Sequence, residues 1–195
     1  MAIEKDFFRQ VAGQFATGIS VVTTHSQGAL AGLTVNAFCT VSLEPPLVLV
    51  CIDLNSTVLP CIRNSGTFVV NILTDEQEHL SRCFATSTLE RYEYFCHASF
   101  HTAATGSPVI DGTLAFFDSR IVAEYPGGDH MIFIGQVEAM GTNGRVAFAH
   151  EEDRQHATIT EYEDNASEEK KLPLAYYLGN YRHLSCDYLK PSLAK

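Results

Sequence analysis

The sequence predicts a mainly β fold, a barrel or a sandwich, as a single domain over residues 1–195. Strand patterns recur about seven times along the chain, and only about three short helices are indicated. Strands and helices never alternate strictly, which argues against a doubly wound parallel sheet. The length and the 46% hydrophobic content allow one substantial core.

The first element is an amphipathic helix over residues 4–15. Phe7, Val11 and Phe15 recur at every fourth position, which places them on one apolar face. Gly18 then ends the helical pattern.

Strand signals follow the helix. The run ISVVTT, the segment ALAGLTVNAF and the apolar run LVLVCI are each typical of a strand, and SQG supplies a turn. Two short helices are then expected, separated by the strand FVVNIL. One is capped by Ser56 or Thr57 and ends at Gly66, and the other opens at a capping box of Thr74 and Gln77.

The C-terminal half is expected to contain two long strands, over residues 113–125 and 130–140, joined by the turn PGGD. An irregular connection over residues 85–112 precedes them, and a last strand is expected over residues 174–184. Residues 151–171 carry eight acidic and three basic side chains, half of the net charge of −10. We expect an inserted, solvated acidic loop there, with a lid or a partner-docking role as the alternative.

Composition excludes several classes of protein. The net charge of −10 and the pI near 5.1 argue against binding to nucleic acid or to an anionic membrane, because both need basic patches. No signal peptide and no membrane-spanning apolar run are visible, so a cytoplasmic location is expected. The six cysteines form no C-x-x-C pair, and we expect them to be reduced thiols.

Several catalytic signatures are absent. The sequence has no G-x-G-x-x-G, G-x-x-x-x-G-K or G-x-S-x-G motif. Cys96, His97 and His101 lack the spacing of a structural zinc site, and no metal site is expected. What remains is the stretch TVNAFCT, which places small polar or sulfur-bearing side chains in an apolar neighbourhood. Either it lines a polar cavity or it closes hydrogen bonds within its own sheet.

Five pieces of the sequence occur in one order and cover most of residues 7–184: FATGISVVTT, GLTVNAFCTVSLEPPLVLVCID, FVVNIL, GGDHMIFIGQV and YYLGNYRHL. Together they resemble the short-chain flavin reductases, the reductase components of two-component flavin-dependent monooxygenases. The resemblance implies an FMN-binding fold, a Greek-key split β-barrel of about six to seven strands with short flanking helices. The acidic segment at residues 151–171 is longer than that family leads one to expect.

In such proteins the segment matching residues 32–38 runs beside the isoalloxazine ring, where backbone amides and short side chains bond the pyrimidine edge. Residues 55–57 open a helix that could receive a phosphate, although Ser56 can equally be a cap alone. Phe84 and Ala85 match a position near the flavin phosphate or adenosine. The cofactor-binding residues implied are Gly32, Leu33, Thr34, Val35, Asn36, Ala37, Cys51, Ile52, Asp53, Asn55, Ser56, Thr57, Phe84 and Ala85.

The resemblance also assigns a nicotinamide site. The histidine of the G-D-H motif, His130 here, lies beside the nicotinamide in the family, and it is the implied catalytic residue. Asp129 could orient that ring or only cap its turn. The nicotinamide-binding residues implied are Phe15, Thr17, His130, Tyr177 and Gly179.

The reaction implied is hydride transfer from NADH or NADPH to FMN or FAD, by an NAD(P)H-dependent flavin reductase. A homodimer and a partner monooxygenase that receives the reduced flavin are expected from the same resemblance. Two alternatives stay open: a flavin-dependent oxidoreductase acting directly on a small organic substrate, and a non-catalytic flavin- or haem-binding module.

Overall fold

The computed structural model of the chain describes residues 3–142, 144–159 and 171–184. Its main sheet is antiparallel throughout, in the order β3-β2-β6-β9-β10-β5-β4, with β11 paired to β10. The strands of this sheet are β2 (Ser20–Ser26), β3 (Ala29–Val35), β4 (Phe38–Leu43), β5 (Pro46–Asp53), β6 (Thr67–Ile72), β9 (Ala115–Gly127), β10 (His130–Thr142) and β11 (Arg145–Phe148).

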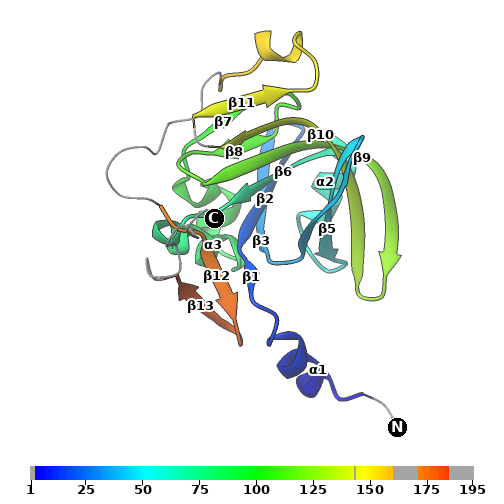
Figure 1. Ribbon diagram of the computed structural model, residues 1–195, viewed down its shortest axis with the longest axis vertical. Coiled ribbons are helices and arrows are strands. Elements are labelled where there is room, and N and C mark those ends of the chain that lie inside the picture. Colours follow the sequence, from blue (N-terminus) through cyan, green and yellow to red (C-terminus); the bar gives the residue numbers. More distant parts are fainter. Residues whose placement is uncertain (1–2, 143, 160–170, 185–195) are drawn as a thin grey trace, which may run out of the picture.

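The two ends of this sheet are joined by a very short link. Strands β3 and β4 lie at opposite ends of the sheet order, yet only Asn36 and Ala37 separate them in the chain. The sheet must therefore curl until its ends meet, and Figure 1 shows the resulting barrel. We call the line where β3 and β4 meet, at residues 36–37, the seam. The open barrel confirms the predicted mainly β, split-barrel fold.

Two small sheets and several helices surround the barrel. The three-stranded sheet contains β1 (Thr17–Gly18), β12 (Leu174–Tyr177) and β13 (Asn180–His183), and the two-stranded sheet contains β7 (Phe100–Thr102) and β8 (Pro108–Ile110). The α-helices are α1 (Lys5–Ala12), α2 (Leu59–Ser65), α3 (Glu78–Phe84) and α4 (Leu89–Tyr92). Single 3₁₀ turns are η1 (Asp75–Gln77), η2 (Phe95–His97) and η3 (Asp153–Gln155).

The core has two main parts, one on each side of β2. Inside the barrel, Val22 packs with Phe68 and Phe133, whereas Val21 on the other face of β2 packs with Phe84 beneath helix α3. A strand that is buried on both faces has no polar positions to alternate with apolar ones. This explains why ISVVTT reads as a continuous β-branched run. The double burial also holds α3 against β3, beside the seam.

Several predicted boundaries are corrected. The N-terminal helix is shorter than residues 4–15, and it projects away from the barrel, with Phe7, Phe8 and Val11 exposed (Figure 1). The single strand expected over residues 174–184 is instead the hairpin β12–β13, whose turn takes positive φ at Leu178 and Gly179. The connection at residues 85–112 contains α4, η2 and the β7–β8 hairpin.

The expectation of reduced thiols is wrong for one pair of cysteines. Cys83 and Cys96 form a disulfide that joins the last turn of α3 to η2. These residues lie 13 apart in the sequence, and the fold brings their Cα atoms to 6.0 Å. Cys39, Cys51 and Cys61 are free thiols, and Cys186 lies outside the described residues.

Within the described ranges, no helix is long and apolar enough to cross a membrane. The same ranges contain no group of three or more His, Cys, Asp or Glu residues that could hold a metal ion. Residues 160–170, most of the acidic segment, lie outside the described part of the chain, so the inserted loop and its lid alternative stay predictions.

Candidate functional site

Within the described residues, the outer edge of strand β3 has no partner strand at the seam. The Gly32 carbonyl faces away from β2, because it accepts a hydrogen bond from Arg91 at 2.9 Å on that side. Peptide groups alternate direction along an antiparallel strand, so Thr34 presents its N–H and C=O on the same outer side. Such an edge can hydrogen-bond a planar heterocycle without rearranging.

A cavity of about 690 Å³ opens at the seam, and we call it the seam cavity. It brings together segments that the sequence analysis assigned to two different ligands. Phe15 and Thr17, predicted to contact the nicotinamide, share its wall with Asn36, Ala37 and Cys51, predicted to contact the flavin. The other lining residues are Ala16, Gly18, Ile19, Ser20, Phe38, Cys39, Leu49 and Ile72.

The Thr17 side chain is an unsatisfied polar group in that wall. Its hydroxyl is buried and has no hydrogen-bond partner within the described structure. Leaving a buried hydroxyl unpaired costs about 1–3 kcal/mol, so such a group usually has a function.

The Cys51 thiol lies in the same wall, and burial raises its pKa above the ordinary value for a cysteine. It therefore remains a neutral thiol at physiological pH and is a poor nucleophile. Among the described residues, no charged side chain lines the seam cavity. The cavity suits binding and positioning of ligands rather than acid–base chemistry by the protein.

A smaller cavity of about 190 Å³ adjoins the first, and the two share Ile19 and Asn36. It lies between β3, the end of α3 and the C-terminal hairpin. The residues that line it are Ile19, Thr34, Val35, Asn36, Ala85, Tyr176 and Tyr181. The hydroxyl of Thr34 donates a hydrogen bond to the Ser81 carbonyl at 2.6 Å, which fixes α3 against β3.

The C-terminal hairpin places a tyrosine that the sequence analysis did not select. Tyr176 lines the smaller cavity, whereas the hydroxyl of Tyr177 donates to Gln14 at 3.2 Å and Gly179 forms the hairpin turn. Neighbouring strand residues face opposite sides, so the choice between Tyr176 and Tyr177 depends on the register of the strand. Pairing of β12 with β1, which opposes Tyr176 and Thr17, sets that register.

The turn after β5 contains four more predicted cofactor-binding residues. The Asp53 carboxylate accepts hydrogen bonds from the backbone amide of Asn55 at 2.7 Å and from its side chain at 3.1 Å. The hydroxyl of Ser56 accepts from the Val58 amide at 3.3 Å, so Ser56 holds the turn that leads into α2. Thr57 points elsewhere, and its hydroxyl donates to the Tyr92 hydroxyl at 3.2 Å.

Several of the predicted cofactor-binding residues are buried, and they support strand β3 from inside the fold. Leu33, Val35 and Ile52 belong to the barrel core. Phe84 is fully buried on the opposite face of β3, where a Cβ at Gly32 would lie 2.8 Å from its ring. Gly32 is therefore the residue that allows α3 to pack so closely.

His130 begins strand β10 opposite Asp53 of β5, at the end of that strand pair. Its Nδ1 lies 2.7 Å from the Asp129 carboxylate, and this hydrogen bond is the main cause that lowers the pKa of Asp129. The half-exposed ring lies beside the Asp53 turn and does not line either cavity. Its contact with a nicotinamide stays a prediction.

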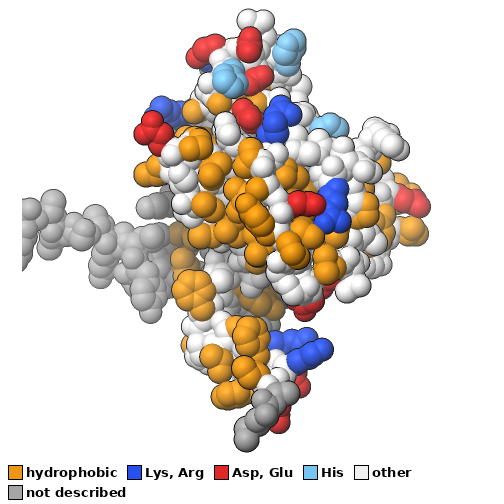
Figure 2. All heavy atoms as spheres, turned by 90° about the vertical axis from the view of Figure 1, so that its right-hand side faces the viewer, with side chains coloured by type: hydrophobic (Ala, Val, Ile, Leu, Met, Phe, Trp, Pro, Cys, Tyr) orange, Lys and Arg blue, Asp and Glu red, His pale blue; other side chains and the backbone are white. Residues whose placement is uncertain are grey.

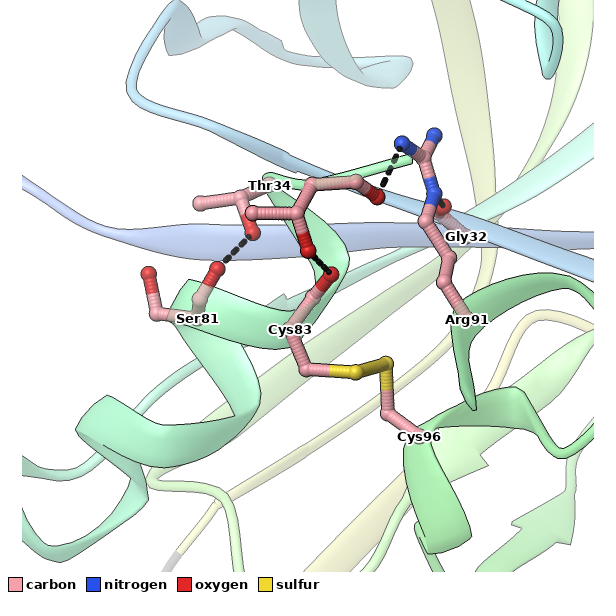
Figure 3. The surroundings of a disulfide bond; sticks show 7 residues. Gly32, Thr34, Ser81, Cys83, Arg91 and Cys96 are labelled. Atoms are coloured by element: carbon pink, nitrogen blue, oxygen red, sulfur yellow. Dashed lines mark hydrogen bonds between the residues drawn. A yellow bond between two sulfur atoms is a disulfide. The ribbon is translucent and has the colours of Figure 1, made fainter. Parts of the chain in front are cut away.

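Sequence reasoning also missed Arg91, which Figure 3 shows reaching from α4 to β3. Its guanidinium donates to the Gly32 and Thr86 carbonyls, at 2.9 and 3.1 Å. The Thr86 hydroxyl in turn donates to the Cys83 carbonyl at 3.0 Å. This series of hydrogen bonds connects the disulfide to the outer edge of β3. No local signal in the irregular 85–112 segment marks Arg91 as buried.

Comparison with known proteins agrees with this geometry. Residues 12–185 match the family model described as a flavin reductase like domain. The reductase subunit HsaB of a flavin-dependent monooxygenase from Mycobacterium tuberculosis is 38% identical over 190 residues, which are 97% of this chain and 88% of the relative.

Two solved structures are similar over nearly the whole chain. Nitrilotriacetate monooxygenase component B from Mycobacterium thermoresistibile has a TM-score of 0.78 at 30% identity, covering 98% of this chain and 92% of that one. An NADH:FAD oxidoreductase from Streptomyces globisporus, solved with NAD and FAD fragments, has a TM-score of 0.75 at 26% identity, covering 98% and 96%. The chain therefore belongs to the flavin reductase like family.

Proposed function

We propose that the protein is an NAD(P)H-dependent flavin reductase that reduces FMN or FAD and supplies the reduced flavin to a partner monooxygenase. The observation that carries the proposal is the seam cavity, where Asn36 and Ala37, predicted to contact the flavin, and Phe15 and Thr17, predicted to contact the nicotinamide, share one wall. Family membership supports the same reading.

The residues fit a flavin on physical grounds. The outward N–H and C=O of Thr34 can pair with the donor and acceptor positions of a pyrimidine edge. Asn36 adds a side-chain amide, and Ala37 is small enough to let a ring approach the backbone. Fixed peptide dipoles stabilise negative charge on that edge without reorganising.

The protein contributes binding and geometry to the reaction. The nicotinamide and the flavin supply the hydride chemistry when both are bound. Phe38 and Leu49 give the seam cavity an apolar wall that excludes water, and Thr17 orients a polar ligand. His130, held by Asp129, is proposed to position the nicotinamide carboxamide from the adjacent strand end.

A homodimer is proposed from exposed apolar surface. Figure 2 shows hydrophobic side chains gathered across the face that includes the β9–β10 hairpin, and again on α1 below it. Phe8 of α1 is 64% exposed and Leu43 of the edge strand β4 is 94% exposed, both unusual for apolar side chains of this size. Phe15, 78% exposed, lines the seam cavity, so a second copy that covered this region would also close the site.

The proposed reaction also has consequences for where in the cell the protein acts and for which protein receives the reduced flavin. NADH and NADPH are cytoplasmic reductants, so the proposal includes a cytoplasmic location. The HsaB relatives, named as reductase subunits of a flavin-dependent monooxygenase, support a separate monooxygenase as the acceptor of reduced flavin.

Steady-state oxidation of NADH and NADPH with added FMN, FAD or no flavin tests the proposal. Turnover that depends on free flavin supports it, and its rate with each pair settles the cofactor preference. Oxidation that requires an organic substrate instead of free flavin would favour the direct oxidoreductase. If no combination oxidises either nicotinamide while flavin still binds, the binding module replaces the proposal. Sedimentation equilibrium tests the dimer, and a monomer at micromolar concentration contradicts it.

A further inference from the structure

Helix α3 and strand β13 are joined by three side-chain contacts. The Glu78 carboxylate lies 3.1 Å from Nε2 of His183. The Ser81 and Tyr181 hydroxyls share a hydrogen bond of 2.9 Å, and the guanidinium carbon of Arg82 lies 4.5 Å from the centre of the Tyr181 ring. Residues three and four apart share one face of a helix, and alternate residues share one face of a strand. One face of α3 therefore matches one face of β13, and we call these contacts the α3–β13 junction.

Ser81 connects this junction to strand β3. Its side chain is fully buried. Its hydroxyl meets Tyr181, whereas its carbonyl accepts the 2.6 Å hydrogen bond from the Thr34 hydroxyl (Figure 3). A buried hydroxyl that loses its partner is costly, so the Ser81–Tyr181 bond holds the two elements at a fixed distance. One residue of α3 therefore ties the C-terminal hairpin to the edge of β3.

Tyr181 also sets the place of Tyr176. The two residues oppose one another in the β12–β13 ladder, and their ring centres lie 5.6 Å apart in an edge-to-face arrangement. Tyr176 pairs in turn with Thr17 of β1, in the wall of the seam cavity. Both tyrosines line the smaller cavity opposite Thr34 of β3. Displacing Tyr181 would therefore move the hairpin side of this cavity relative to the β3 side.

The two sides belong to different ligands in the proposed function. Thr34 lies on the edge predicted to hold the flavin, and Thr17 lies in the segment predicted to contact the nicotinamide. Hydride transfer needs its two reacting atoms about 3–3.5 Å apart, and a misplacement of about 1 Å can slow a reaction roughly a hundredfold. A group that fixes these two elements relative to one another therefore controls the rate of transfer without touching either reacting atom.

Resting on the proposed function, we propose that Tyr181 is a positioning residue for hydride transfer, whose hydrogen bond to Ser81 holds the hairpin at a set distance from the ring-binding edge of β3. The Tyr181 ring packs against the core, and the hydroxyl is the part that reaches α3. The side chains of His183 and Arg82 are 56% and 63% exposed, so their contacts contribute little. The buried hydroxyl pair carries the positioning.

The test compares Tyr181→Phe, Ser81→Ala and the double variant with the wild type. Single-turnover stopped-flow gives the rate of flavin reduction by NADH, and separate titrations give the Kd of each ligand. We expect each single variant to slow flavin reduction about tenfold and to weaken the long-wavelength charge-transfer absorption of the nicotinamide–flavin complex. Each Kd should change less than about twofold, and Tm should fall by less than about 4 °C.

The double variant should be no slower than either single variant, because all three remove the same hydrogen bond. Tyr94→Phe is the matched control and should behave as the wild type. Tyr94 is 56% exposed and lines neither the seam cavity nor the smaller cavity.

An unchanged reduction rate in Tyr181→Phe overturns the inference, and a lower Tm with that unchanged rate would show that the bond only supports the fold. A raised Kd for NADH with an unchanged rate overturns it too, because the hydroxyl would then be a ligand contact. Losses that add up in the double variant would mean that the two hydroxyls act separately, which also contradicts it.

Ser81→Ala leaves the tyrosine hydroxyl unpaired, so that variant is the one at risk of not folding. The double variant leaves no unpaired hydroxyl and then supplies the rate in its place. A wild type that oxidises NADH with added flavin, beside an unimpaired Tyr181→Phe, sinks this inference alone. No oxidation by the wild type with any flavin sinks the proposed function.

Discussion

The amide of Cys51 donates a hydrogen bond to the carbonyl of Ala37 at 3.1 Å, joining the interior strand β5 to the two-residue link between β3 and β4. This bond fixes the floor of the seam cavity and leaves the outward edge of Thr34 free. The Ala37 side chain is exposed in the cavity wall. We therefore expect the small size of Ala37 to matter for the proposed ligand rather than for the fold.

Ala37→Leu should block flavin binding without unfolding the protein. The added side chain would enter the seam cavity, and we expect the Kd for FMN to rise at least about tenfold. The free energy of unfolding should change by less than about 0.5 kcal/mol, as for other exposed positions. Ala29→Leu, at the exposed start of β3, is the control. Unchanged flavin affinity in Ala37→Leu would place the ring elsewhere.

Thr17→Val should weaken ligand binding while leaving stability unchanged or raised. The substitution removes a buried hydroxyl that has no partner in the described structure, so the free protein loses no hydrogen bond. We expect the KM for NADH to rise about 5- to 20-fold, the value of one hydrogen bond to a ligand. Thermal unfolding measures the stability. A large fall in Tm with an unchanged KM would mean that the hydroxyl is structural.

His130→Ala is expected to raise the KM for NADH about tenfold and to leave the Kd for flavin within about twofold. The reason is that His130 lies at the end of the β5–β10 pair, outside the wall of the seam cavity. His101→Ala is a matched control, because His101 forms a similar exposed pair with Asp111 at 2.5 Å. Identical behaviour of the two variants would refute a role for His130.

Breaking the Cys83–Cys96 disulfide should destabilise the protein and weaken flavin binding together. A bridge that closes a loop of this length contributes roughly 3 kcal/mol. Cys83 also accepts the hydrogen bond from Thr86, which in turn positions Arg91. Tm and the Kd for FMN, measured with and without dithiothreitol, test both effects in the wild type and in Cys96→Ser. Cys39→Ser should respond to dithiothreitol as the wild type does. A wild type that is insensitive to the reductant contradicts the prediction.

Asp118 makes part of the stability depend on pH. The carboxyl group is fully buried on β9, and this burial raises its pKa from 3.8 to about 6, although Thr105 donates to it through its hydroxyl and through its amide, the latter at 2.8 Å. The folded state therefore holds the proton more tightly than the unfolded state. The resulting stability, about 3 kcal/mol, is complete below pH 4 and is lost as the pH rises through 6.

Asp118→Asn should abolish that dependence, because asparagine stays neutral. Urea unfolding of the variant is expected to show a flatter profile between pH 4 and 7 than the wild type, with Asp6→Asn, an exposed carboxylate, unchanged from the wild type. Parallel pH profiles for Asp118→Asn and the wild type would show that Asp118 does not titrate in this range.

Features set by neighbouring residues could be predicted from the sequence. The Thr74 amide donates to the Gln77 side chain at 3.1 Å, and a helical turn begins where the capping motif placed it. The long strands β9 and β10 also pair as predicted, around the turn at Gly128 and Asp129. The signals for these elements are local, and the fold supports them.

Features set by distant contacts could not be predicted in the same way. Arg91 lies in a segment without periodicity, and its burial depends on the edge of β3, 59 residues earlier. The disulfide depends on η2, where Cys96 takes a left-handed backbone conformation that its type does not favour. Tyr176 faces a cavity because β12 pairs with β1. Only tertiary structure supplies this information.

The short link of Asn36 and Ala37 makes β3 and β4 neighbours in the chain, while six successive strand pairings connect the same two strands around the barrel. The geometry of the seam therefore depends on all six pairings being in register. A ligand bridging those ends clamps the whole barrel. Bound flavin should consequently protect amides on β9 and β10, none of whose residues lines the seam cavity, against hydrogen exchange, and occupancy becomes a measure of how completely the chain has folded.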